Sequence, residues 1–234
     1  MPPLNDMGDP PAPIDPHCPP HPSLPLSASP SPAEAQGRAG ARLVGGTPPA
    51  LADPTRTPQE TSAYGLPYSL RVAAPQDAAE IEDLLRKAYG RLLVPDYGGA
   101  ELAAALPGLS AAYPAFLASP TCFIAEGPCG RILGCGGWSE FSPFRARSFA
   151  GLGHVHHIVT DPDHIGSGIG AAIFGQVELS ARLAGITRLH ALVTRTAAGF
   201  FRAQGMQAMG EVAMRITPEI RLPAEEMHMD LAGV

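Results

Sequence analysis

Basic residues and membrane-length apolar runs are scarce in this sequence. Lys87 is its single lysine, only 16% of its 234 residues are charged, and the net charge at neutral pH is -6. A chain with no cluster of Lys and Arg is not expected to bind nucleic acid. No stretch of about 18 apolar residues exists to span a bilayer. The start, MPPLNDMGDP, lacks the basic region and apolar core of a signal peptide. We therefore expect a cytoplasmic protein with no membrane or nucleic-acid partner.

Cysteine is also rare, and the four cysteines form no CxxC pair. Cys122 and Cys135 lie in apolar, strand-like runs, which favours buried free thiols. Cys18 lies between His17 and His21, a set that could bind a metal only in a fixed cage. The proline-rich surroundings favour no such cage, so we expect no metal site.

Proline is distributed unevenly. Of the 27 prolines, 17 lie in residues 1–67, a segment that is also rich in Ala, Ser and Gly. Such a segment buries too little apolar surface to offset the entropy of ordering, so we predict that it is disordered. It is either a docking tail or a dispensable extension, and we favour the extension. Residues 68–234 are long enough for one domain with a real core.

The folded part alternates between strand and helix patterns. YSLRVAA alternates as a strand does, and a helical stripe then runs from Pro75 to about Gly90. A second helical patch ends at Pro107-Gly108, and two apolar runs joined by Pro128-Cys129-Gly130 predict a hairpin. The remaining predicted elements are strands at 153–160, 188–194, 207–217 and 226–231 and helices at 168–184 and 196–206. This order favours an α/β fold with a mixed sheet and helices on its faces.

The most informative segment is the glycine-rich turn HIGSGIGAA, which follows a strand and opens a helix. Backbone N–H groups at a helix start, with glycines that allow close approach, favour a phosphate. A GxxxxGK[ST] loop is absent. Residues 166–171 fit GxGxxA, but no acidic residue lies between Glu178 and Glu211 to bind a ribose. We therefore discount a nicotinamide-dependent oxidoreductase.

Over residues 68–234, the strand ending in VTDP, this turn, RLHALV and TAAGFFRAQGM together resemble the GNAT superfamily of N-acetyltransferases. The resemblance implies six to seven mostly antiparallel strands, one splayed parallel pair and about four helices. It also implies acetyl-CoA as cosubstrate, lying between the splayed strands. Carried over by position, the cofactor-binding residues are Ile158, Val159 and Thr160 for the pantetheine arm, the N–H groups of Ile165, Gly166, Ser167, Gly168, Ile169 and Gly170 for the pyrophosphate, and Thr196 and Phe201 on the short helix.

Two positions depart from the family pattern. The turn has Ile165 where Arg or Gln is usual, and Gly166 and Ser167 stand where basic residues are frequent, so we expect weaker CoA binding. Phe201 stands where a Tyr often protonates the departing thiolate, and Thr196 where Asn is frequent. A catalytically degenerate CoA-binding module is therefore the alternative to an active enzyme.

A base is needed because an alkyl amine is mostly protonated at neutral pH, and histidine has a suitable pKa. His154 and His156 are two residues apart on a predicted strand and are expected on one face, with His157 on the other. This His-x-His is similar to that of serotonin N-acetyltransferases. We take His156 as the preferred catalytic base and His154 as second, with Glu140 as the rival. There are two alternatives. These histidines could serve only in packing, or His154 and His156 could bind a metal together with His190.

The acceptor is not identified by the sequence. Trp138, Phe141 and Phe144 could line its pocket, although a core position for Trp138 is an equal expectation. We expect transfer of an acetyl group to a primary amine, with a small molecule favoured as acceptor. The resemblance also implies pairing of two copies through the late strands, which makes a homodimer an option.

Overall fold

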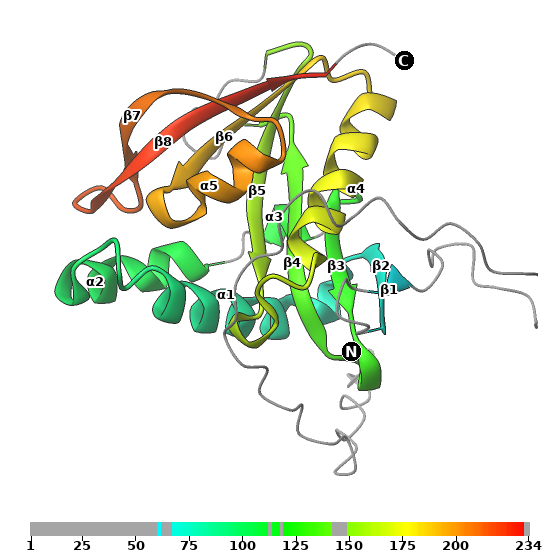
Figure 1. The fold of residues 1–234 in the computed structure, drawn as a ribbon, viewed down its shortest axis with the longest axis horizontal. Helices are drawn as coiled ribbons and strands as arrows, with labels where there is room; N and C mark the ends of the chain where they lie inside the picture. Colours follow the sequence, from blue (N-terminus) through cyan, green and yellow to red (C-terminus); the bar gives the residue numbers. More distant parts are fainter. Residues whose placement is uncertain (1–59, 62–66, 112–113, 118, 142–148, 232–234) are drawn as a thin grey trace, which may run out of the picture.

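The computed structural model describes residues 60–61, 67–111, 114–117, 119–141 and 149–231 (Figure 1). The strands are β1 (Glu60–Thr61), β2 (Pro67–Val72), β3 (Cys122–Glu126), β4 (Ile132–Ser139), β5 (Leu152–Thr160), β6 (Arg188–Thr194), β7 (Gln207–Arg215) and β8 (Arg221–Asp230). The helices are α1 (Ala78–Leu92), α2 (Gly99–Ser110), α3 (Pro114–Leu117), α4 (Ile169–Leu183) and α5 (Arg195–Ala203), with short 3-10 turns at Pro75–Asp77, Pro128–Gly130 and Pro162–His164.

All the described strands form one sheet in the order β1-β2-β3-β4-β5-β6-β8-β7. The pairing is antiparallel except between β5 and β6, which are parallel. A parallel pair requires a crossover connection, and α4 supplies it. The expected mixed sheet, with seven longer strands, one parallel pair and four helices of nine or more residues, is confirmed. The two-residue β1 lies inside the segment for which the sequence predicts disorder.

Helices cover both faces of the sheet (Figure 1). The face under α1 packs Leu84 and Leu85 against Cys135 and Val159. The opposite face packs Phe174 of α4 and Phe201 of α5 against the β6 side chains. Successive side chains along a strand point to opposite faces of the sheet, so one strand contributes to both cores. Cys122 and Cys135 are buried free thiols, as expected.

Helix α2 continues through Pro107 to Ser110, so the expected end at Pro107-Gly108 is wrong. A proline removes one N–H bond from a helix. Tertiary packing holds the last turn nevertheless, because Leu109 is buried beside Met214 and Leu222. A Cβ on Gly108 would lie 2.6 Å from the Ile216 side chain, which shows how closely the β7–β8 hairpin packs here. Among the described residues, no helix has the length and apolar character needed to cross a bilayer.

Candidate active site

Strands β5 and β6 separate after a short parallel contact. Their pairing covers Leu152 with Arg188, Gly153 with Leu189 and His154 with His190, although the strands are nine and seven residues long. Beyond this point β5 stays paired with β4, and β6 with β8. The sheet therefore opens between Val155–Thr160 on one side and Ala191–Thr194 on the other, as expected for a splayed pair.

A β-bulge interrupts β5 at the opening. Gly137 pairs with His156 and Cys135 pairs with Val159, so one residue of β4 faces two residues of β5. His157 has φ 47°, a conformation that non-glycine residues rarely adopt and that is often found at functional sites. The bulge also changes where His157 points. Its ring and that of His156 both contact Phe116, at centroid distances of 6.0 and 5.1 Å. The expectation that His157 lies on the opposite face is therefore wrong.

Two glycines of β4 make room for this bulge and for α4. A Cβ on Gly136 would lie 2.5 Å from Cδ1 and 3.1 Å from Cα of Ile158. A Cβ on Gly134 would lie 2.8 Å from Ile169 and 2.9 Å from the Val159 carbonyl oxygen. Glycine within a strand often marks such an approach. The sequence GCGG at 134–137 already contains this signal.

The turn predicted to bind the pyrophosphate lies at the open end of β5. Gly166 and Gly168 have φ 81° and 88°, and a Cβ on either would meet no atom within 4 Å. Gly168 is also the N-cap of α4, so the first N–H groups of the helix point toward the turn. Ser167 is buried, and its hydroxyl donates to the His164 carbonyl at 2.6 Å. The predicted residues at 165–170 therefore form an open, glycine-shaped helix start.

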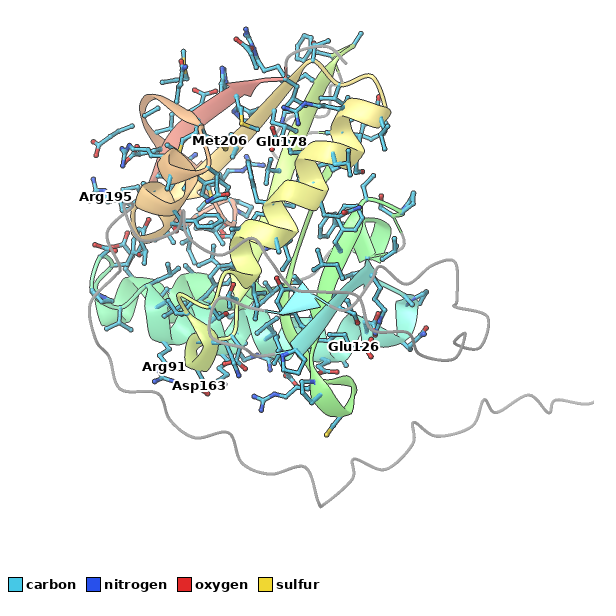
Figure 2. The ribbon with its side chains drawn as sticks, turned by 45° about the vertical axis from the view of Figure 1, so that its right-hand side comes forward. Arg91, Glu126, Asp163, Glu178, Arg195 and Met206 are labelled. Carbon is cyan, nitrogen blue, oxygen red and sulfur yellow. The ribbon has the colours of Figure 1, made fainter. Side chains whose placement is uncertain are left out.

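Charged residues fasten this turn to α1. Asp161 is 3% exposed, and its carboxylate accepts hydrogen bonds from Lys87 Nζ at 2.7 Å, Arg131 Nη2 at 3.0 Å and the Asp163 N–H at 3.0 Å. Burial opposes the charged carboxylate, but these donors outweigh it and lower the pKa of Asp161. Asp163 pairs with Lys87 and with Arg91, which lowers its pKa to about 2, and Figure 2 shows Arg91 and Asp163 next to each other at the lower left. Asp161 and Asp163 directly follow the predicted strand at 153–160, and their spacing along the chain gives no sign of this role.

Some of the other predicted cofactor residues border the opening, and others are buried in the cores. Thr160 and Gly170 come together, because a Cβ on Gly170 would lie 3.3 Å from Thr160 Oγ1 and 3.4 Å from the Phe200 ring. Phe200, which the sequence analysis did not single out, therefore borders the opening. Phe201 is 6% exposed and packs edge-to-face against Phe174. Ile158 packs in the core under α4 and α5, and Val159 packs in the core under α1. Ile169, in the first turn of α4, is buried.

Thr196, at the start of α5, forms a hydrogen bond with the segment between α1 and α2. Its hydroxyl donates to Asp96 Oδ2 at 2.5 Å. The neighbouring Tyr97 is buried, donates to the Pro223 carbonyl at 2.7 Å and accepts from the Arg195 N–H at 3.0 Å. These bonds connect the start of α5 to the helices on the other face. The cofactor contact predicted for Thr196 stays a prediction.

His156 has a defined tautomer. The single hydroxyl hydrogen of Ser139 is donated to the Phe141 carbonyl at 2.7 Å, so Ser139 Oγ accepts from His156 Nε2 at 2.8 Å. The Nδ1 atom of His156 therefore carries the lone pair. Burial, followed by the nearby His157 and His154, lowers the pKa of His156 to about 3. The imidazole is therefore neutral at physiological pH, with a free lone pair on Nδ1 that is only weakly basic.

His154 heads a chain of polar groups across three strands. His190 Nε2 lies 3.0 Å from Glu226 Oε1, and His190 Nδ1 lies 3.1 Å from His154 Nδ1. The carboxylate only accepts, so His190 Nε2 donates to it. With His190 neutral, its Nδ1 accepts from His154, which places the lone pair of His154 on Nε2. His157 does not belong to this hydrogen-bonded chain, because its Nδ1 lies 3.0 Å from the Tyr89 hydroxyl. Burial lowers the pKa of His157 to about 4.

The expected acceptor-pocket residues do not gather. Trp138 is 3% exposed and donates to Ser180 Oγ at 2.9 Å, so it belongs to the core. Phe141 is 70% exposed. Phe144 lies outside the described residues, as does Cys18 with its two flanking histidines. Glu140, the rival base, is exposed just beyond the end of β4.

Comparisons with known proteins agree with this geometry. Residues 118–207 match the family model for the acetyltransferase (GNAT) domain, which confirms the resemblance seen in the sequence. None of the curated proteins compared with the chain matches it. Among solved structures, a GCN5-related N-acetyltransferase from Rhodopseudomonas palustris is 22% identical, with a TM-score of 0.56 over 75% of this chain and 99% of that one. A GNAT superfamily phosphinothricin acetyltransferase from Sinorhizobium meliloti, solved with acetyl-CoA, is 18% identical, with a TM-score of 0.50 over 70% and 88%. At these identities the two structures establish the fold.

Proposed function

We propose that this chain, which carries a GNAT acetyltransferase domain, transfers an acetyl group from acetyl-CoA to a primary amine, with a small molecule as acceptor. The observation that carries the proposal is the opening between β5 and β6, with a glycine-shaped helix start at one end and the His156 imidazole at the bulge. The phosphinothricin acetyltransferase of similar fold was solved with acetyl-CoA, which supports the same cosubstrate here.

Acetyl-CoA would lie in this opening with its pyrophosphate on the N–H groups of residues 165–170. The Ser167 N–H already donates to the His164 carbonyl at 3.3 Å, and the other N–H groups at the helix start, with the positive end of the helix dipole, favour an anion there. Lys87 and Arg131 hold Asp161, and thereby hold the turn that carries these groups. The backbone of 158–160 would align the pantetheine arm, and an N–H near Val159 would polarise the thioester carbonyl.

The reaction follows from the histidine geometry. The free amine attacks the carbonyl carbon, a C–N bond forms, the C–S bond breaks, and the thiolate leaves and takes a proton from water. The amine loses its proton to Nδ1 of His156, which returns it to water and so replaces the proton given to the thiolate, while Nε2 keeps its hydrogen bond to Ser139 Oγ. A pKa near 3 makes His156 a weak resting base. We therefore assign it a relay role, in which it moves the proton during the attack and does not store it.

Binding and turnover test the proposal separately. Thermal unfolding of the full chain is followed with acetyl-CoA, CoA and NAD, and a ligand at about 100 times its Kd adds roughly 2.7 kcal/mol of stability. Stabilisation by both CoA species and not by NAD supports the cosubstrate. A panel of amines, followed by release of the free thiol, then tests transfer. No stabilisation by acetyl-CoA would refute the enzyme function.

Two variants separate the candidate bases. We expect His156→Ala to lower kcat/KM by about 10²-fold, because a positioned proton-transfer group contributes roughly that factor. Glu140→Gln removes the exposed rival and should leave kcat/KM near that of the wild type. The opposite ranking would assign the proton transfer to Glu140. Equal, wild-type values for both variants would exclude both residues.

A CoA-binding module without efficient turnover is the second candidate. It is favoured by Phe201, which lies in the core and has no hydroxyl to protonate a thiolate, and by Ile165, an exposed apolar residue on the turn. This candidate predicts the same stabilisation by CoA and acetyl-CoA. It predicts no thiol release above the uncatalysed rate with any amine of the panel.

A further inference from the structure

Three side chains with metal-binding atoms meet on the face of the sheet that carries α2. His190 on β6 pairs with His228 on β8, and Glu226 lies two residues before His228 on the same face. One ligand atom from each of the three lies within 4.8 Å of the others. The proposed acetyl transfer uses none of these atoms directly. We call His190, Glu226 and His228 the β6–β8 cluster.

The spacing in the β6–β8 cluster suits a zinc ion. Zn²⁺ binds imidazole nitrogen and carboxylate oxygen at about 2.0–2.2 Å, which puts neighbouring ligands of a tetrahedral site roughly 3.3 Å apart. His190 Nε2 and His228 Nε2 lie 3.0 and 3.8 Å from Glu226 Oε1, and these distances bracket that value. The two imidazole rings are 5.2 Å apart and tilted, so their nitrogens can converge on one point.

Space and charge also favour a cation. On β7 the residue opposite Glu226 is Gly210, and a Cβ there would meet nothing within 4 Å. Glu226 is 35% exposed and His228 27%, so solvent reaches the cluster. In the part of the chain that the structure describes, the ion pairs of Glu226 are with the two histidines and with no Lys or Arg. Among the described residues, no Lys or Arg therefore offsets the charge of this carboxylate.

We propose that His190, Glu226 and His228 form a zinc-binding site with three protein ligands and one open position for water. When the ion binds Nε2 of His190, the ring hydrogen of His190 moves from Nε2 to Nδ1. Nδ1 then donates to His154 Nδ1, 3.1 Å away, which is the second contact that a metal-bound histidine usually makes, and His154 shifts its own hydrogen from Nδ1 to Nε2. This site is independent of acetyl transfer, and it revises the expectation of no metal.

The test measures zinc binding to the full chain by competition with a chromophoric chelator. Because His17, Cys18 and His21 can bind zinc themselves, the reference protein carries His17→Ala, Cys18→Ser and His21→Ala. We expect one zinc ion per chain. Glu226→Gln and His228→Asn should each weaken the affinity by at least about 10-fold. Glu225→Gln is the matched control, since Glu225 adjoins Glu226 but pairs with Arg202, and its affinity should stay within about two-fold.

A second measurement uses the reference protein, in which the β6–β8 cluster is unchanged, so its result does not depend on whether a variant folds. In the reference protein, NMR of the histidine ring nitrogens should show two imidazoles losing the Nε2 proton when zinc is added. Thermal unfolding in the presence of a chelator shows whether each variant is folded. The proposal is overturned if the reference protein binds no zinc, if no ring nitrogen changes, or if folded Glu226→Gln binds zinc as tightly as Glu225→Gln.

Discussion

Lys87→Met tests how the turn before α4 is held. The substitution keeps the aliphatic stem of Lys87 and removes the ammonium group, which lies 2.7 Å from Asp161 Oδ1 and 2.8 Å from Asp163 Oδ2. Asp161 is left with Arg131 and the Asp163 N–H as donors. Breaking a fully buried pair costs about 3–5 kcal/mol, and an exposed pair contributes about 0–1 kcal/mol. Asp161 is buried, but Lys87 is 37% exposed and Arg131 remains. We expect a loss of about 1–2 kcal/mol in the free energy of unfolding.

The loss should depend on pH in a defined direction. The folded state lowers the pKa of Asp161, so its ion pairs stabilise the protein above the ordinary carboxyl pKa, near 4. This stabilisation disappears as the pH falls through the lowered pKa of the folded state. The difference between wild type and Lys87→Met should therefore be complete at pH 7 and smaller near pH 3. Asp163 keeps part of its contact to lower pH, since its pKa is about 2.

Urea unfolding at several pH values measures these differences. The control is Arg86→Met, one residue earlier on α1, which breaks an exposed pair with Asp83 and should cost less than about 0.5 kcal/mol. The KM for acetyl-CoA should also rise in Lys87→Met, because the turn loses one of its ties to α1. Equal stability of wild type and Lys87→Met at pH 7, or an equal loss in Arg86→Met, would refute the reasoning.

Three further predictions concern the turn, the bulge and the sheet edge. Ile165→Arg adds a positive charge at a position that is 56% exposed. Because such an exposed contact contributes up to about 1 kcal/mol, we expect calorimetry to show acetyl-CoA binding about two- to five-fold tighter. Unchanged affinity would contradict this expectation. His156 and His157 have folded pKa values of about 3 and 4, below the unfolded 6.5, so the unfolded chain binds more protons and the two histidines together should lower the free energy of unfolding by about 3 kcal/mol from pH 6.5 to 5. His157→Asn should flatten that slope in denaturant titrations, and an unchanged slope would count against the assignment. Strand β7 lies at one edge of the sheet, so a homodimer formed through the late strands would pair there, and a monomer mass by light scattering at every concentration would exclude that dimer.

The sequence by itself determined the order of the elements and the chemistry of the turn. Alternating apolar residues in strands such as β2 and β6, the continuous apolar runs of β3 and β4, and the apolar stripe of α1 are local patterns, because side-chain direction along one strand or helix depends only on local geometry. Gly166 and Gly168 have the positive φ that the glycine-rich pattern indicates. Both features are set by residues within a few positions of each other, so one stretch of sequence contains the whole signal.

The tertiary structure alone decided which distant groups meet. The bulge at His157 depends on the register of β5 against the glycines of β4, and it reversed the face expected from strict alternation. Lys87 reaches Asp161 across 74 positions, and His190 reaches Glu226 across 36, because packing of α1 and pairing of β6 with β8 bring them together. The energy of such contacts depends on burial and on the donors already present. Neither quantity is contained in the spacing of residues along the chain.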